Sequence, residues 1–187
     1  MKTILASLLP VILCAALSAA QAAPPQSPDA ADEAESLSAA AADLFNQGKY
    51  DEAGRHAEQA VAAWEKARGA EHADAAKALY LLGAVRMAQG RFVDADPPLT
   101  RALAIYEKAP AAPDLGLARV LNYLSVARFK QGREGEAVKL VQRSLQLAES
   151  LLGPEQVELA EFLKLAADIY RISPTTSCSC RPAGSEG

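Results

Sequence analysis

The sequence predicts an all-α fold, an α-solenoid in which helical hairpins of equal length stack side by side. Glycine accounts for only 11 of the 187 residues, yet a Gln-Gly pair recurs at Gln47-Gly48, Gln89-Gly90 and Gln131-Gly132. The three glycines therefore stand at 48, 90 and 132, with 42 residues between neighbours. On both sides of each glycine, apolar residues recur at steps of three and four, the period of an α-helix. A fixed interval of this kind is the signature of an internal repeat array.

The second repeat shows why each unit is expected to be a pair of helices. Apolar residues precede Gly90 at helical spacing, and a second helical series follows it: Phe92, Ala95, Leu99, Ala102, Leu103 and Tyr106. Gly90 can adopt the left-handed conformation that ends the first helix. Small residues at Gly83 and Ala95 would let the two helix backbones approach closely. The unit is therefore predicted to be a helical hairpin.

These residues resemble the tetratricopeptide repeat pattern. The positions that carry the resemblance are Leu79, Leu82, Gly83, Gly90, Phe92, Ala95, Leu99 and Ala102. The 42-residue period is longer than the family's usual period of about 34 residues and is similar to the kinesin-light-chain variety. The resemblance implies a right-handed α-solenoid over residues 35–172, with about three repeats and a C-terminal capping helix. One departure is Pro97-Pro98, which is expected to bend or delay the second repeat's outer helix because two N–H donors are lost.

The chain begins with a segment that is typical of a secretory signal. Residues 1–22 contain Lys2, then an apolar run broken by Pro10, and end in Ala20-Gln21-Ala22, which fits small-x-small cleavage. The alternative is an N-terminal membrane helix, which the shortness of the run and its proline disfavour. We therefore expect an exported protein, periplasmic or secreted and of bacterial type. Residues 23–34, which contain three prolines, are predicted to be a flexible spacer.

The repeat domain then follows in order. Repeats are expected at about 35–68, 73–109 and 114–151, with the capping helix at 155–171. One side of that helix is predicted to be polar through Glu155, Glu158, Glu161, Lys164 and Asp168, since the last unit of a solenoid has no neighbour to cover it. Residues 173–187 are predicted to be a disordered tail. Its Cys178 and Cys180 form either incidental thiols or a pair that could be oxidised, bind a metal or cross-link two chains.

Catalytic chemistry has little support in the sequence. His56 and His72 are the only histidines, and neither belongs to a metal-binding or nucleophile motif. No phosphate-binding glycine loop is present, so we expect no enzyme activity, no cofactor and no metal. The net charge of −4 disfavours nucleic acid, which requires a basic stripe.

The candidate site is the concave groove that the first helices of such an array line. Residues in register across units become neighbours there, and the predicted binding residues are Lys77, Tyr80, Met87, Arg119, Asn122, Val126, Phe129 and Lys164. Met87, Val126 and Phe129 would form an apolar floor. Alternatively, Met87 and Phe129 would pack between helices, and the lysines would be ordinary solvated groups. Arg86 and Arg128, also 42 residues apart, either extend the basic groove or lay their stems along apolar neighbours.

Two functions follow from this reading. The first is a non-catalytic scaffold that binds a peptide or protein partner, acidic or extended with an apolar anchor, in the concave groove. The second is a self-associating structural module, a homodimer that Cys178 or Cys180 would cross-link.

Overall fold

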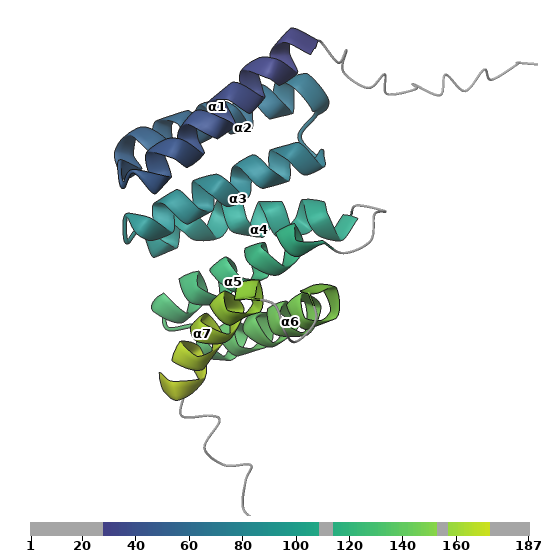
Figure 1. The fold of residues 1–187 in the computed structure, drawn as a ribbon. Coiled ribbons are helices and arrows are strands. Elements are labelled where there is room, and N and C mark those ends of the chain that lie inside the picture. The colour runs from purple at the N-terminus through teal and green to yellow at the C-terminus, as the bar shows by residue number, and fades with distance from the viewer. Residues whose placement is uncertain (1–27, 109–113, 153–156, 173–187) are drawn as a thin grey trace, which may run out of the picture.

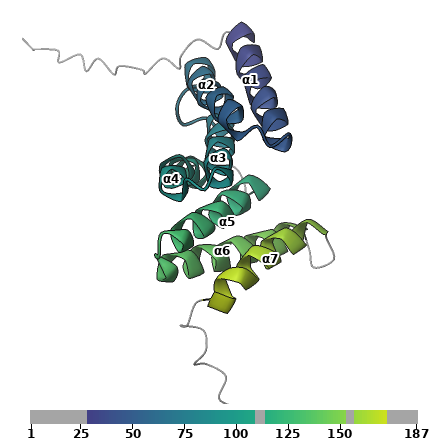
Figure 2. The ribbon, with the colours of Figure 1, turned by 90° about the vertical axis from the view of Figure 1, so that its left-hand side faces the viewer.

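The computed structural model describes residues 28–108, 114–152 and 157–172, and within these ranges the chain forms helices and no strand. The helices are α1 (Pro28–Asn46), α2 (Tyr50–Arg68), α3 (Ala73–Ala88), α4 (Phe92–Lys108), α5 (Leu115–Lys130), α6 (Glu134–Leu152) and α7 (Val157–Ile172). Figures 1 and 2 show successive hairpins stacked along one direction, with α1 at one end and α7 at the other. The predicted all-α solenoid is confirmed. The predicted signal segment 1–22 and the tail with its two cysteines lie outside the described residues.

The three repeated glycines end the first helix of each hairpin, as predicted. Gly48, Gly90 and Gly132 have φ of 76°, 75° and 79°, in the region that residues with a Cβ rarely occupy. In each turn the N–H of the next residue donates to a carbonyl in the last turn of the helix, as Arg91 does to Arg86 at 2.9 Å. This bonding pattern is that of a Schellman cap, which satisfies carbonyls that the helix end leaves without donors. The glycine cap recurs every 42 residues, and it places the same turn in each unit.

Helix α1 begins at Pro28, so the predicted spacer of residues 23–34 is wrong from residue 28 onward. Proline is tolerated at the first position of a helix, where its missing N–H has no partner in any case. Asp29 in the first turn favours the same start, because its charge complements the helix dipole. Ala34 is fully buried and Ala31 packs against the first core cluster. Residues 28–34 are therefore part of a helix whose apolar side packs on the core.

Helix α4 runs from Phe92 through Pro97 and Pro98 to Lys108, so the two prolines do not delay it. Pro98 has no N–H to donate to the carbonyl of Asp94, four residues earlier. The guanidinium of Arg86 on α3 donates to that carbonyl instead, with Nη1 at 2.8 Å from the oxygen. A side chain of the neighbouring helix thus replaces a hydrogen bond that the sequence removes.

Close packing within a hairpin depends on small residues, again as predicted. A Cβ built on Gly83 of α3 would lie 2.5 Å from Cγ of Leu99 on α4, and Leu99 is fully buried. Glycine is needed here because the leucine occupies the space that a side chain would take. The first helices of the units also contact one another in the order α1, α3, α5 and α7. This inner row of helices positions the candidate site.

Candidate functional site

The inner row of helices forms a groove of about 470 Å³ between α3, α5 and α7. Its lining residues are Tyr80, Arg119, Asn122, Tyr123, Phe162, Lys164 and Leu165. Four of the eight residues named from the sequence therefore come together here: Tyr80, Arg119, Asn122 and Lys164. They come from three helices that are separated along the chain, so the stacking of the repeats makes the groove.

Two aromatic rings lie against each other in this groove. Tyr80 of α3 and Tyr123 of α5 meet edge to face, with ring centroids 5.2 Å apart and planes at 82°. Both side chains are half-buried. Sequence reasoning missed Tyr123, Phe162 and Leu165, although a signal was present for Tyr123 and Leu165. A row of large apolar residues recurs at 42-residue intervals at Leu81, Tyr123 and Leu165. It lies next to the predicted row of Tyr80, Asn122 and Lys164.

Asn122 is the most unusual polar residue of the groove. It is 4% exposed, and its Oδ1 atom is buried without a hydrogen-bond partner. An unpaired buried polar atom costs free energy, on the order of 1–3 kcal/mol. A side-chain amide in this position can pair with a backbone amide of an extended peptide, which offers one donor and one acceptor per residue.

The cations of the groove have no carboxylate partner among the side chains that the structure describes. Arg119 and Lys164 are exposed, and neither forms an ion pair with any of those side chains. None of the described residues that line the groove is acidic. The groove therefore combines two cations without a carboxylate partner among the described side chains, an aromatic pair and an amide, in a chain whose net charge is −4.

Lys77 does not join this groove. It lies on α3 beside a separate hollow of about 430 Å³, lined also by Trp64, Arg68 and Asp74. Its Nζ is 2.9 Å from Oδ1 of Asp74, which Arg68 also contacts at 2.8 Å. Burial acts to raise the pKa of Asp74, but the hydrogen bond from Lys77 and the charges around it hold that pKa below its usual value. The charge of Lys77 is thus already balanced within the protein.

Met87, Val126 and Phe129 are half-buried residues of helix–helix contacts. Met87 packs against a core cluster that contains Leu99 and Leu124. Val126 and Phe129 pack against the cluster formed with Val141, Ala166 and Ile169. This is the alternative that the sequence left open for Met87 and Phe129, and Val126 packs in the same way. The apolar surface of the groove comes from its tyrosines and from Phe162 and Leu165 instead.

Arg86 and Arg128 lie away from the groove and link neighbouring units. Arg86 reaches Glu58 on α2 at 3.0 Å as well as the carbonyl of Asp94 on α4. Arg128 reaches Glu136 on α6 at 2.9 Å and Oγ1 of Thr100 on α4 at 3.4 Å. Their side chains are 22% and 18% exposed. Neither of the two roles expected for them describes these residues. They do not line the groove, and their guanidinium groups contact neighbouring helices.

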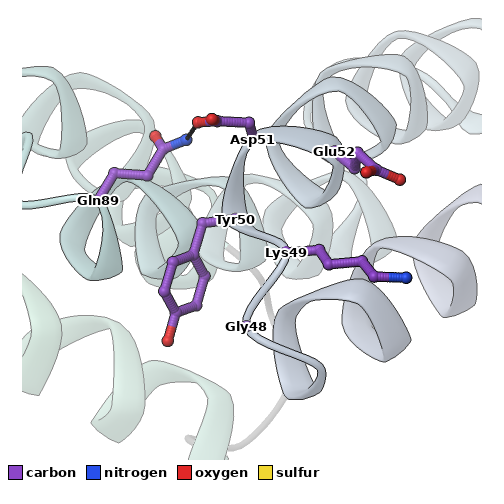
Figure 3. A pocket seen from close by; sticks show the side chains of 6 residues that line it. All are labelled: Gly48, Lys49, Tyr50, Asp51, Glu52 and Gln89. Carbon is purple, nitrogen blue, oxygen red and sulfur yellow. Dashed lines mark hydrogen bonds between the residues drawn. The ribbon is translucent and has the colours of Figure 1, made fainter.

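A further pocket lies at the first hairpin turn and is shown in Figure 3. It has a volume of about 410 Å³ and is lined by Gly48, Lys49, Tyr50, Asp51, Glu52 and Gln89. Nε2 of Gln89 donates to Oδ1 of Asp51 at 2.8 Å, across the boundary between two units. Figure 3 shows the side chains of Lys49 and Glu52 directed away from this pair. The facing polar groups satisfy each other, which is the reverse of the situation at Asn122.

The two histidines have different surroundings: His72 caps a helix, whereas Nδ1 of His56 is buried without a hydrogen-bond partner. Nδ1 of His72 accepts from the N–H of Asp74 at 3.2 Å and so caps α3, while Asp114 caps α5 in the same register. His56 is half-buried on α2. Across the described ranges no group of three or more His, Cys, Asp or Glu side chains could hold a metal ion. Nor does any helix in that part of the chain have the length and apolar character needed to span a membrane.

Comparison with known proteins adds to this geometry. Two family models, both described as tetratricopeptide repeat, match residues 32–108 and 117–158, together more than half of the chain. Similar solved structures include a putative kinesin light chain from Podosopora anserina with nearly identical TPR-like repeats, with a TM-score of 0.65 and 23% identity over 73% of this chain and 65% of that one. No curated protein matches the chain.

Two other solved structures share the fold. BtubC (BKLC) from P. vanneervenii has a TM-score of 0.63 and 18% identity over 74% of this chain and 55% of that one. The Sgt2 TPR domain from Aspergillus fumigatus has a TM-score of 0.58 and 14% identity over 83% and 88%. This chain spans less than two thirds of the length of the kinesin light chain and of BtubC. At these identities the likeness concerns the fold alone.

Proposed function

This chain belongs to the tetratricopeptide repeat family, and we propose that it is a non-catalytic scaffold that holds an acidic, extended peptide segment of a partner protein in the groove between α3, α5 and α7. Repeats of this family generally mediate protein–protein interaction and typically form non-catalytic scaffolds. The proposal goes further in naming the surface and the chemistry of the ligand.

The unpaired Oδ1 of Asn122 is the observation that carries the proposal. Its burial without a partner is unfavourable in the free protein, and a ligand N–H would remove that cost once the amide turns toward the groove. Only 4% of the residue is exposed in the free protein, so this turn is part of the binding step. An amide held in this way suits the backbone of an extended peptide and does not depend on the peptide's sequence.

The charges of the groove supply the preference for acidic side chains. Arg119 and Lys164 are exposed cations without carboxylate partners among the described residues, whereas the chain as a whole is acidic. An acidic peptide is therefore attracted to the groove and repelled by much of the remaining surface, which favours one docking position. The tyrosine pair and Leu165 offer an apolar contact for a side chain between the acidic residues.

The test begins with a random peptide library displayed on phage and selected on the purified chain. We expect the enriched peptides to contain aspartate or glutamate, and a fluorescent copy of one of them then serves as the probe for anisotropy. The double variant Arg119→Glu/Lys164→Glu should weaken its affinity by about 10- to 100-fold, because two attractive charges become repulsive. The matched control is Arg55→Glu/Lys139→Glu, the same charge change at exposed positions on α2 and α6. Equal weakening by both double variants would refute the groove as the binding surface.

We also propose that the chain is exported, on the strength of residues 1–22. The basic start, apolar run and small-x-small end of this segment are those of a cleaved signal. Expression of the whole chain in a bacterial host followed by N-terminal sequencing is the direct test. A mature form that begins at Ala23 is the expected result, and an N-terminus at Met1 in the cytoplasmic fraction would contradict export.

A further inference from the structure

On α3, α5 and α7 three positions recur at 42-residue intervals, and on α3 and α5 they face the second helix of the hairpin. They are Ala76, Leu79 and Gly83 on α3, Ala118, Leu121 and Ser125 on α5, and Ala160, Leu163 and Ala167 on α7. On α3 and α5 all of these positions are buried. On α7 all three are exposed, and Leu163 is 47% exposed where Leu79 is 4% and Leu121 is 0%. The same residue types thus lie in the core twice and at the surface once.

The difference has a simple origin in the covering helices. On α3 the three positions are covered by α4, whose Leu99 lies directly against Gly83. On α5 they are covered by α6, whose Ser144 donates from Oγ to the carbonyl of Ala118 at 2.8 Å. No helix in the described ranges takes this place on α7, which lies at the end of the stack in Figure 2.

The two covering helices share a pattern that defines what the face accepts. Each runs antiparallel to the helix it covers and carries a branched aliphatic residue, Leu99 or Val141, at equivalent positions. Three residues later each has a small residue, Ala102 or Ser144, and all four of these residues are buried. Leu99 fits over Gly83 of the inner helix, and Ser144 lies close enough to α5 to donate to the carbonyl of Ala118.

We infer that the open face of α7, formed by Ala160, Leu163 and Ala167, binds an amphipathic helix of a partner protein that runs antiparallel to α7 and carries this pattern. An end helix that served only to face water would have a polar outer row, yet this row keeps the apolar and small residues of the buried units. The residues that follow α7 do not encode the pattern. Residues 173–187 include Pro174 and Pro182 and contain no leucine, isoleucine, valine, methionine or phenylalanine.

The probe for this inference is a fluorescent synthetic peptide with the sequence of residues 134–152, the chain's own α6. We expect saturable binding to the full-length chain, measured by anisotropy, with weakening of about tenfold or more in Leu163→Glu because a charge then occupies the centre of the face. Ala167→Leu, which fills the small position without adding charge, should weaken it similarly. The matched control is Val93→Glu, at an apolar residue of α4 that is 71% exposed and lies off the face.

Several results would overturn the inference. One is the absence of saturable binding, and another is binding that Leu163→Glu and Ala167→Leu leave unchanged, which would mean that the peptide exchanges with α6 or binds elsewhere. A third such result would come from sedimentation velocity of the chain alone. Reductant is added to keep Cys178 and Cys180 from cross-linking. A dimer that Leu163→Glu dissociates would show that a second copy covers the face in place of a partner's helix.

Discussion

The outer helices and the inner groove use the same kinds of charged residue in opposite ways. On the outer helices Arg101 pairs with Glu65 of the preceding unit, and Arg143 pairs with Glu107 in the same register. In the groove, Arg119 and Lys164 have no carboxylate partner among the described residues. The stacking of the units accounts for the cations that form the same pair in successive units. Cations that the stacking leaves unpaired are the ones that a ligand can use.

The largest effect on stability is expected from the paired side of this comparison. Arg86→Ala should lower the free energy of unfolding by about 1–2 kcal/mol, because the carbonyl of Asp94 loses the donor that replaces the absent N–H of Pro98. Urea denaturation followed by circular dichroism gives the value. Affinity for a groove-binding peptide should stay unchanged. Arg55→Ala, an exposed arginine on α2, is the control, and an equal loss in both variants would contradict the role of Arg86.

A gain of stability is expected from the unpaired side. Asn122→Leu keeps the branching and the number of heavy atoms and removes the buried Oδ1 that has no partner, so the free energy of unfolding should rise by about 1 kcal/mol. The same change should weaken peptide binding, since the groove loses its amide. Denaturation and anisotropy on one preparation measure both. A variant that is less stable than the parent chain would show that Asn122 is satisfied in solution.

The smallest effect is expected at the outer ion pairs. Arg143→Ala should lower the free energy of unfolding by no more than about 0.5 kcal/mol, because both members of its pair with Glu107 are substantially exposed to water. The difference should shrink as sodium chloride is raised, since exposed charges are screened. Denaturation at low and high salt tests this. A loss that is larger and independent of salt would mean that Arg143 contributes packing as well as charge.

Much of the fold was predictable because the sequence repeats itself. A fixed interval between Gly48, Gly90 and Gly132 places three turns at once, and the helices between them follow from the apolar period. The start of α1 was not predictable in this way, since Pro28 can equally end a spacer or begin a helix. The continuation of α4 past its two prolines is supported by Arg86, a residue of another helix, and this was not predictable from the pattern.

The candidate site was predictable only in part, for a physical reason. Register shows which residues form a row across units, but it does not show whether a row faces the groove or the next helix. Helix α3 is apolar on most sides because it is covered by several neighbours, so its pattern gives no single buried face. Met87 and Tyr80 therefore looked alike in sequence. The unpaired state of Asn122 depends on atoms of other residues, which no pattern in the chain records.

The pairs Glu65–Arg101 and Glu107–Arg143 also have a mechanical consequence. They link α2 to α4 and α4 to α6, pairs of helices that have no close backbone contact with each other. Such ion pairs oppose the separation of neighbouring units on their side of the stack. Each pair is exposed to water and therefore weak, so it adds only a small resistance to the separation of neighbouring units. This resistance comes from residues that no ligand in the groove would touch.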